Sequence, residues 1–64
     1  MNKIQELRKS TGLSRPKFAE LTGVSRHTIR SWENGARNPM PFAVKEVERI
    51  AKVYRANKES INHG

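Results

Sequence analysis

Two short segments joined by a very short connection constrain this chain more than any other feature. Residues 12–35 run GLSRPKFAELTGVSRHTIRSWENG, and apolar side chains recur in both halves at helical spacing. Gly23 can end the first helix in a left-handed conformation, and Ser25 can cap the start of the second. Because only Val24 then remains between the two segments, the turn predicts two helices that cross steeply.

The second of these helices, residues 26–34, separates its side chains by chemistry. At about 100° per residue, Ile29 is at the centre of the inward face, with Trp32 and Glu33 on either side of it. The opposite side and its flank hold hydrogen-bonding side chains and no acid: Arg26, His27, Arg30, Ser31 and Asn34. Many helices carry such a face simply because it is solvated. The lack of acids, the type of side chain and the tight preceding turn favour insertion into the major groove of DNA.

The charge balance agrees with a polyanionic partner. The chain of 64 residues has 13 Lys and Arg against six acidic residues, for a net charge of +7. Such an excess favours DNA, RNA or an acidic membrane surface, although a basic protein without any such partner would have the same composition. RNA recognition usually needs exposed aromatic side chains for stacking, whereas the aromatic residues here fall mostly on inward faces. We therefore predict double-stranded DNA as the partner, and no membrane.

Nothing in the sequence indicates catalysis. The chain has no Cys and two His, and neither His27 nor His63 has a second ligand at metal-binding spacing. No Glu–His pairing has catalytic spacing, so we expect no enzyme activity, no metal and no cofactor. No apolar run is long enough to span a bilayer, and no signal peptide precedes the first helix. These features predict a cytoplasmic location, either in the cytosol or at the nucleoid.

The chain is predicted to form one compact all-α domain over residues 1–57, with four helices or at most five. Residues 58–64 are polar and are expected to form a flexible tail. The four helices are expected at about residues 2–11, 15–22, 26–34 and 41–56. The predicted core draws on all of them: Ile4, Leu7, Leu13, Phe18, Leu21, Val24, Ile29, Trp32, Val47, Ile50 and Tyr54.

The residues of these helices resemble those of a known DNA-binding family. The pattern A-x-x-x-G-V-S followed by I-x-x-W-E-x-G is similar to the helix-turn-helix of the phage Cro and lambda-repressor-like group, also called the xenobiotic-response-element family. The matching residues are Leu13, Ser14, Phe18, Ala19, Gly23, Val24, Ser25, Ile29, Trp32, Glu33, Gly35 and Pro39. With Ile4, Leu7 and Arg8, the resemblance covers about residues 2–55. It implies sequence-specific binding of double-stranded DNA by a transcriptional regulator, in the first instance a repressor.

The resemblance also implies which side chains meet DNA. Positions matching Arg26, His27, Arg30 and Ser31 face base edges in the major groove. Positions expected to contact phosphates flank that groove: Ser14, Arg15, Lys17, Ser25, Asn34 and Arg37. The family further pairs the positions of Arg8 and Glu33. We therefore expect a partly buried, charge-assisted contact that fixes the first helix against the third.

The chain departs from the common family pattern beyond the loop that follows the third helix. Many members have a short fourth helix and then a fifth that builds a dimer contact, whereas one longer helix, 41–56, is predicted here. Its apolar residues exceed one stripe, because Val44 and Val53 cannot both share the side of Val47 and Ile50. The surplus suggests a surface for a homodimer on DNA or for a partner protein. The alternative function is therefore a protein-interaction module, such as an antitoxin or a phage or plasmid accessory factor, whose DNA binding is secondary.

Overall fold

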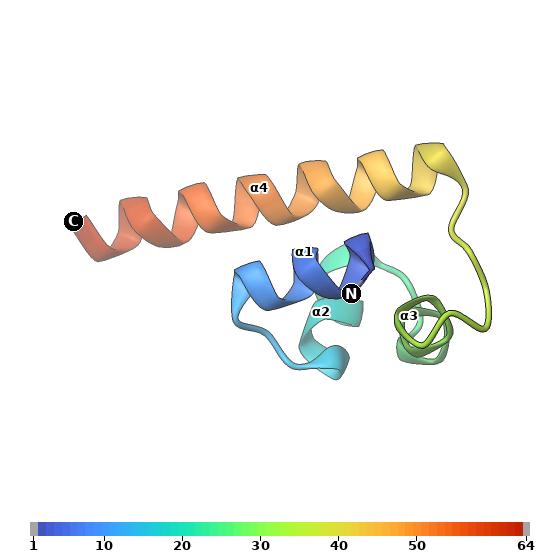
Figure 1. Ribbon diagram of the computed structural model, residues 1–64. Helices are drawn as coiled ribbons and strands as arrows, with labels where there is room; N and C mark the ends of the chain where they lie inside the picture. Colours follow the sequence, from blue (N-terminus) through green and yellow to red (C-terminus); the bar gives the residue numbers. More distant parts are fainter. Residues whose placement is uncertain (1, 64) are drawn as a thin grey trace.

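Four helices and no strand make up the part of the chain that the structure describes, which confirms the all-α class. The structure is a computed structural model that describes residues 2–63, with side chains from Asn2 to Lys58. Figure 1 shows α1 and α2 lying on one side of the long α4, with α3 seen end-on near the start of α4. The helices are α1 (Lys3–Thr11), α2 (Arg15–Thr22), α3 (Arg26–Glu33) and α4 (Pro41–His63).

Short-range hydrogen bonds define the ends of the first three helices. Asn2 caps α1, since its Oδ1 accepts from the backbone N–H of Gln5 at 2.9 Å. The Ser25 hydroxyl caps α3 in the same way, accepting from the N–H of Thr28 at 3.1 Å. Gly23 ends α2 with a φ of 75°, a left-handed conformation that costs glycine little. The tight turn predicted between α2 and α3 is therefore present.

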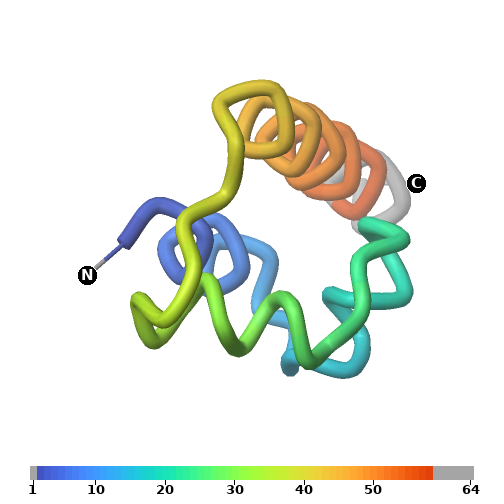
Figure 2. Tube along the Cα trace, turned by 90° about the vertical axis from the view of Figure 1, so that its right-hand side faces the viewer, coloured from blue at the N-terminus to red at the C-terminus, as the bar shows by residue number. Residues whose placement is uncertain are grey.

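One core joins all four helices. Its fully buried members are Ile4, Leu7, Phe18, Ile29, Val47 and Ala51, and Phe18, Ile29 and Ala51 have no exposed surface at all. α1 packs along α4 and also against α3, while α2 packs against α3 and α4. Figure 2 views the same arrangement turned by 90°, with α4 running beside the other three helices. The first three helices therefore share a single apolar centre, and α4 closes it.

The core differs from the predicted one on α4. Ile50 and Tyr54 are only half-buried, and Ala51 takes the fully buried position. Ala51 is one turn from Val47 on the same side of α4, and it has no exposed surface. Trp32 is also only partly buried, and it packs against the edge of the core. Although Trp32 is the largest side chain, the completely buried aromatic residue of the core is Phe18.

The fourth helix is longer than predicted, because it continues past residue 56 to His63. No Gly or Pro interrupts the chain between Pro41 and His63, so the backbone meets no residue that stops a helix. The molecule measures 41 × 21 × 21 Å, and its long direction is that of α4 (Figure 1). The flexible tail predicted for 58–64 falls mostly on residues whose side chains lie outside the description. None of the described helices has the length and apolar character needed to span a membrane.

The two phenylalanines offer a matched test of the core. Phe18→Ala should lower the free energy of unfolding by about 3–5 kcal/mol, because it empties a fully enclosed site. Phe42→Ala removes the same atoms from a side chain that is 68% exposed, and should change the stability by about 0.5 kcal/mol or less. Urea unfolding followed by circular dichroism measures both values. Equal losses in the two variants would contradict this assignment of the core.

Candidate nucleic-acid interface

The outward face of α3 presents a group of cationic and hydrogen-bonding side chains. Arg26, His27 and Arg30 are exposed, and Ser31 is half-buried beside them. Ile29 lies on the opposite side of α3 and is completely buried. Since α3 is anchored to the core by that side, the four polar side chains are held on a surface that solvent or a ligand can reach.

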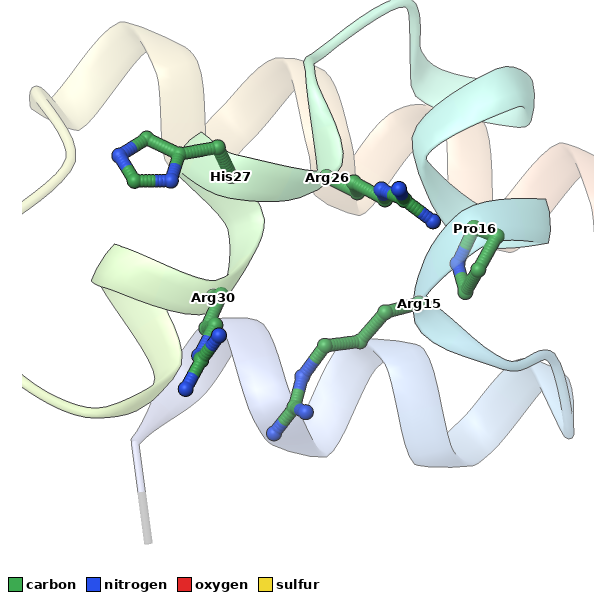
Figure 3. Close-up of a pocket in the computed structure, with 5 residues that line it drawn as sticks. All are labelled: Arg15, Pro16, Arg26, His27 and Arg30. Atoms are coloured by element: carbon green, nitrogen blue, oxygen red, sulfur yellow. The ribbon is translucent and has the colours of Figure 1, made fainter.

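These side chains share a hollow with the start of α2. It is lined by Arg15 and Pro16 from α2 and by Arg26, His27 and Arg30 from α3. Figure 3 shows the Arg15 side chain extending from α2 towards α3, while Arg26 points back towards Pro16 and His27 points away from the hollow. Three guanidinium groups at one opening create a strongly positive potential. The sequence placed Arg15 with the predicted phosphate contacts, and the fold brings it next to Arg26 and Arg30, which were predicted to face bases.

The first turn of α2 adds polar groups to the same edge. Ser14 precedes the helix, and its hydroxyl makes no capping hydrogen bond, so it is available to a ligand. Lys17 is exposed one turn further on. The free backbone N–H groups at this helix end are those of Arg15 and Lys17, since Pro16 has none, and the helix dipole favours negative charge there. This edge is therefore suited to an anion such as a phosphate.

The Glu33 carboxylate binds two arginines and joins three helices. Arg8 from α1 donates from Nε to Oε2 at 2.7 Å and from Nη2 to Oε1 at 3.1 Å. Arg15 from α2 donates from Nε to Oε1 at 3.1 Å. The Glu33 side chain is only 1% exposed, against 16% for Arg8 and 45% for Arg15. The predicted contact between Arg8 and Glu33 is present, and Arg15 extends it to α2.

The ionisation of this group follows from its surroundings. Burial alone raises the pKa of the Glu33 carboxyl, but the hydrogen bonds and positive charge of Arg8, followed by those of Arg15, bring that pKa below its ordinary value. The hydrogen bond to Glu33 in turn raises the pKa of Arg8. Glu33 is therefore a carboxylate at neutral pH, and its negative charge lies on the inner side of α3, away from His27 and Arg30.

A second brace holds the end of α3. The Nδ2 of Asn2 donates to the carbonyl oxygens of Trp32 and Glu33, at 2.6 Å and 2.8 Å. These carbonyls are at the C-terminus of α3, where backbone oxygens lack helical partners. Because the Oδ1 of Asn2 also caps α1, one amide links the start of α1 to the end of α3. Asn2 and the Glu33 ion pairs thus hold the C-terminal end of α3 together.

The remaining predicted phosphate contacts are spread around α3. The Ser25 hydroxyl is used in capping α3, and it lies 2.9 Å from the hydroxyl of Thr28. The Oδ1 of Asn34 accepts from the N–H of Ala36 at 2.9 Å, which leaves its amide N–H groups free of this turn. Arg37 is exposed in the loop after α3, where its backbone N–H donates to the carbonyl of Ser31. Asn34 and Arg37 follow the C-terminal end of α3, whereas Ser25 is at its N-terminal end.

Sequence analysis missed two contributions to this site. The bonds of Asn2 to the end of α3 depend on a tertiary approach that no local pattern encodes. Arg15 was assigned to phosphate alone, although its Nε is bound to Glu33. When an acidic residue lies on the inward side of a helix and the neighbouring helix is basic, the sequence indicates an ion pair between the two helices. This pattern does not indicate which of several arginines will bind the acid.

Comparison with known proteins agrees with this geometry. A family model described as a helix-turn-helix domain matches residues 2–63, which include every side chain of the site. The comparisons with curated proteins and with solved structures gave no match. The family match confirms the resemblance seen in the sequence.

Acid should weaken the fold through Glu33. The pKa of Glu33 in the folded protein is below its ordinary value of 4.5. The stability that its ion pairs contribute is therefore complete above pH 4.5 and is lost as the pH falls through the lower pKa of the folded state. Near pH 7, Glu33→Gln should lower the free energy of unfolding by about 3 kcal/mol, because Arg8 then keeps a partly buried charge without its counter-ion. Urea unfolding between about pH 7 and pH 3 should show the gap between wild type and Glu33→Gln closing in acid. Glu20→Gln, at an exposed carboxylate, is the control; an unchanged gap at all pH values would contradict this role.

Proposed function

Since the chain belongs to the family of helix-turn-helix domains, whose characteristic role is DNA binding, we propose that it recognises specific sites in double-stranded DNA as a transcriptional regulator, in the first instance a repressor. α3 enters the major groove, and the protein acts in the cytoplasm, at a bacterial or phage nucleoid. The observation that carries the proposal is the face formed by Arg26, His27 and Arg30. It is exposed, lacks carboxylates and belongs to a helix whose only acid is neutralised on its inner side.

Base recognition falls to the first two turns of α3. The guanidinium groups of Arg26 and Arg30 can each donate two hydrogen bonds to O6 and N7 of a guanine, which favours a site containing G. His27 can donate to guanine N7 or O6, and the short Ser31 side chain accepts several bases. No other described side chains combine this exposure with a fixed helical spacing and the steep crossing of a helix-turn-helix.

Phosphate contacts on both sides of α3 set its register on the duplex. Ser14, Lys17 and the backbone at the start of α2 contact phosphates on one side. Ser25 does so at the N-terminal end of α3, and Asn34 with Arg37 at its C-terminal end. Arg15 takes part with its two Nη groups, because only its Nε is bound to Glu33. An arginine held in this way loses less conformational freedom on meeting a phosphate than a free surface side chain does.

We further propose that α4, within residues 41–56, is the contact surface for assembly, either with a second copy on DNA or with a partner protein. One recognition helix covers only a few base pairs, and dimers of such domains match two-fold symmetric sites. Among the side chains that the structure describes, Met40, Phe42 and Val53 are the large apolar ones that are exposed, and each is on α4 or directly before it. Exposed apolar surface of this kind marks contact sites on small domains.

A second candidate function rests on the same exposed residues. Met40 and Phe42 line a shallow hollow together with Trp32 and Pro39, on the side of the loop between α3 and α4. A module that mainly binds another protein, such as an antitoxin or a phage or plasmid accessory factor, would use this apolar surface and bind DNA secondarily. The basic face of α3 has no role in that function, which is why DNA recognition is the first proposal.

Substitutions on the two kinds of contact should separate specificity from affinity. Arg30→Ala should weaken the best site by about 1–3 kcal/mol and relax its base preference, because a base-edge contact is lost. Lys17→Ala should weaken all duplexes similarly and reduce the slope of log affinity against log salt by about one. Sites are first selected from a random duplex pool. Binding to the selected and to unrelated duplexes is then measured over a salt series.

The control for this experiment is Lys9→Ala, which removes one exposed positive charge from α1, outside α4 and the face of α3. It should leave base preference unchanged and affect affinity less than Lys17→Ala. Identical effects of Arg30→Ala and Lys17→Ala on selected and unrelated DNA would mean that α3 attracts DNA by its charge alone and does not read bases. A failure of the wild-type protein to bind any duplex would favour the protein-interaction candidate.

A further inference from the structure

One ridge on the outer side of α4 is left without a partner by the fold. It consists of Phe42, Glu46, Arg49 and Val53, and we refer to these four residues as the α4 ridge. Phe42 is 68% and Val53 48% exposed, and the side chains of Glu46 and Arg49 are 56% and 63% exposed. At about 100° per residue the four positions lie within about 60° of one another, well away from the side that faces the core.

The spacing of the ridge is that of a helix pair. Its members follow one another at intervals of four, three and four residues, as the a and d positions of a coiled-coil heptad do. The two ends are apolar and the middle is charged. This pattern belongs to a contact surface rather than to a uniformly solvated face, because large apolar side chains occupy both ends of the same stripe.

The order of the ridge makes it complementary to itself. From the N-terminal end it runs apolar, acidic, basic, apolar; from the other end it runs apolar, basic, acidic, apolar. When two copies of α4 lie antiparallel about a two-fold axis between Val47 and Glu48, each Phe42 faces the other copy's Val53. In the same register each Glu46 faces the other copy's Arg49. A parallel pair would instead bring like charges together at both positions.

We propose that two copies of this chain dimerise through antiparallel α4 helices, with the α4 ridge of one copy packed on that of the other. This inference rests on the proposed use of α4 as a contact surface, and it is independent of DNA binding. The partner is a second copy of the chain, because a two-fold axis places the acidic residue of each ridge opposite the basic residue of the other. An unrelated partner would not require that symmetry.

The charged centre of the ridge is already ordered within one chain. Arg49 donates to Glu46 from Nε to Oε1 at 3.0 Å and from Nη2 to Oε2 at 2.7 Å. Two such pairs facing each other in opposite directions place each carboxylate between two guanidinium groups. The pairing therefore adds attractions across the interface without breaking the existing bonds.

Two features keep this dimer weak in free solution. Each copy carries a net charge of +7, and Lys45 and Lys52 border the ridge, so the two chains repel each other. The contact is also small, since four side chains per copy bury less surface than a standard protein interface. The dissociation constant should consequently be micromolar or weaker, and the test needs a concentrated sample.

The experiment uses complementary charge reversals and sedimentation equilibrium up to about 1 mM protein. Glu46→Lys makes both central positions positive in each copy, and Arg49→Glu makes both negative. Each variant alone should dimerise at least about tenfold more weakly than wild type, a loss of about 1.4 kcal/mol. An equimolar mixture of the two should recover association as a heterodimer, because a positive ridge then faces a negative one. Both variants lack the internal pair, so a weakened helix cannot produce this recovery.

Glu20→Lys and Lys9→Glu are the matched controls, since they make the same charge changes outside the ridge. Neither should alter the dimer, and mixing them should add nothing. Phe42→Ala should also weaken association without loss of helical circular dichroism. A wild-type chain that stays monomeric throughout, or charge variants that gain nothing on mixing, would overturn the inference. Binding of the same variants to a short duplex keeps the two proposals apart: retained DNA binding without a dimer refutes only the α4 contact, and a dimer without DNA binding refutes only the proposed function.

Discussion

The position of the recognition surface depends on one buried carboxylate. Glu33 is on the inner side of α3, and its two oxygens receive hydrogen bonds from Arg8 of α1 and Arg15 of α2. An ion held in this way is costly to bury, and the cost is offset only when the geometry and the remaining hydrogen bonds are good. Here one acid orients three helices at once, so the angle of α3 and the place of the Arg15 guanidinium are set together.

This arrangement separates the charges of α3. The negative charge of Glu33 is drawn inward and compensated, while Arg26 and Arg30 remain outside with no acid beside them. The same contact brings Arg15 to the edge of the exposed group, so a stabilising interaction also shapes the surface that meets a ligand. Folding energy and surface potential are therefore coupled in this domain: loss of Glu33 would change both the stability and the distribution of positive charge.

Features that depend on a few neighbouring residues were predicted from the sequence more completely than features that depend on tertiary packing. The capping residues, the Gly23 turn and the first three helices followed from propensities that act within a few residues. The burial of Ala51 in place of Ile50 did not, because it depends on how closely neighbouring helices approach α4. The resemblance suggested the Arg8–Glu33 contact, but the reach of Arg15 depends on side-chain torsions that no spacing specifies. The structure continues α4 to His63, beyond the predicted end at about residue 56, and no Gly or Pro there interrupts the helix.

The two sides of α4 have different surroundings: one packs on the core and the other is exposed. Only Val47 and Ala51 of its described side chains are fully buried, and two positions one turn apart are enough to close the core over α1 and α2. A helix built only for that task would not need large apolar side chains at residues 42 and 53 on its other side. Hydrophobic groups on a small domain are easily lost when nothing covers them, since a polar substitution there removes no core contact. The outer side of α4 therefore contributes nothing to the core, and the charge order of the ridge favours a second α4 as its proposed partner.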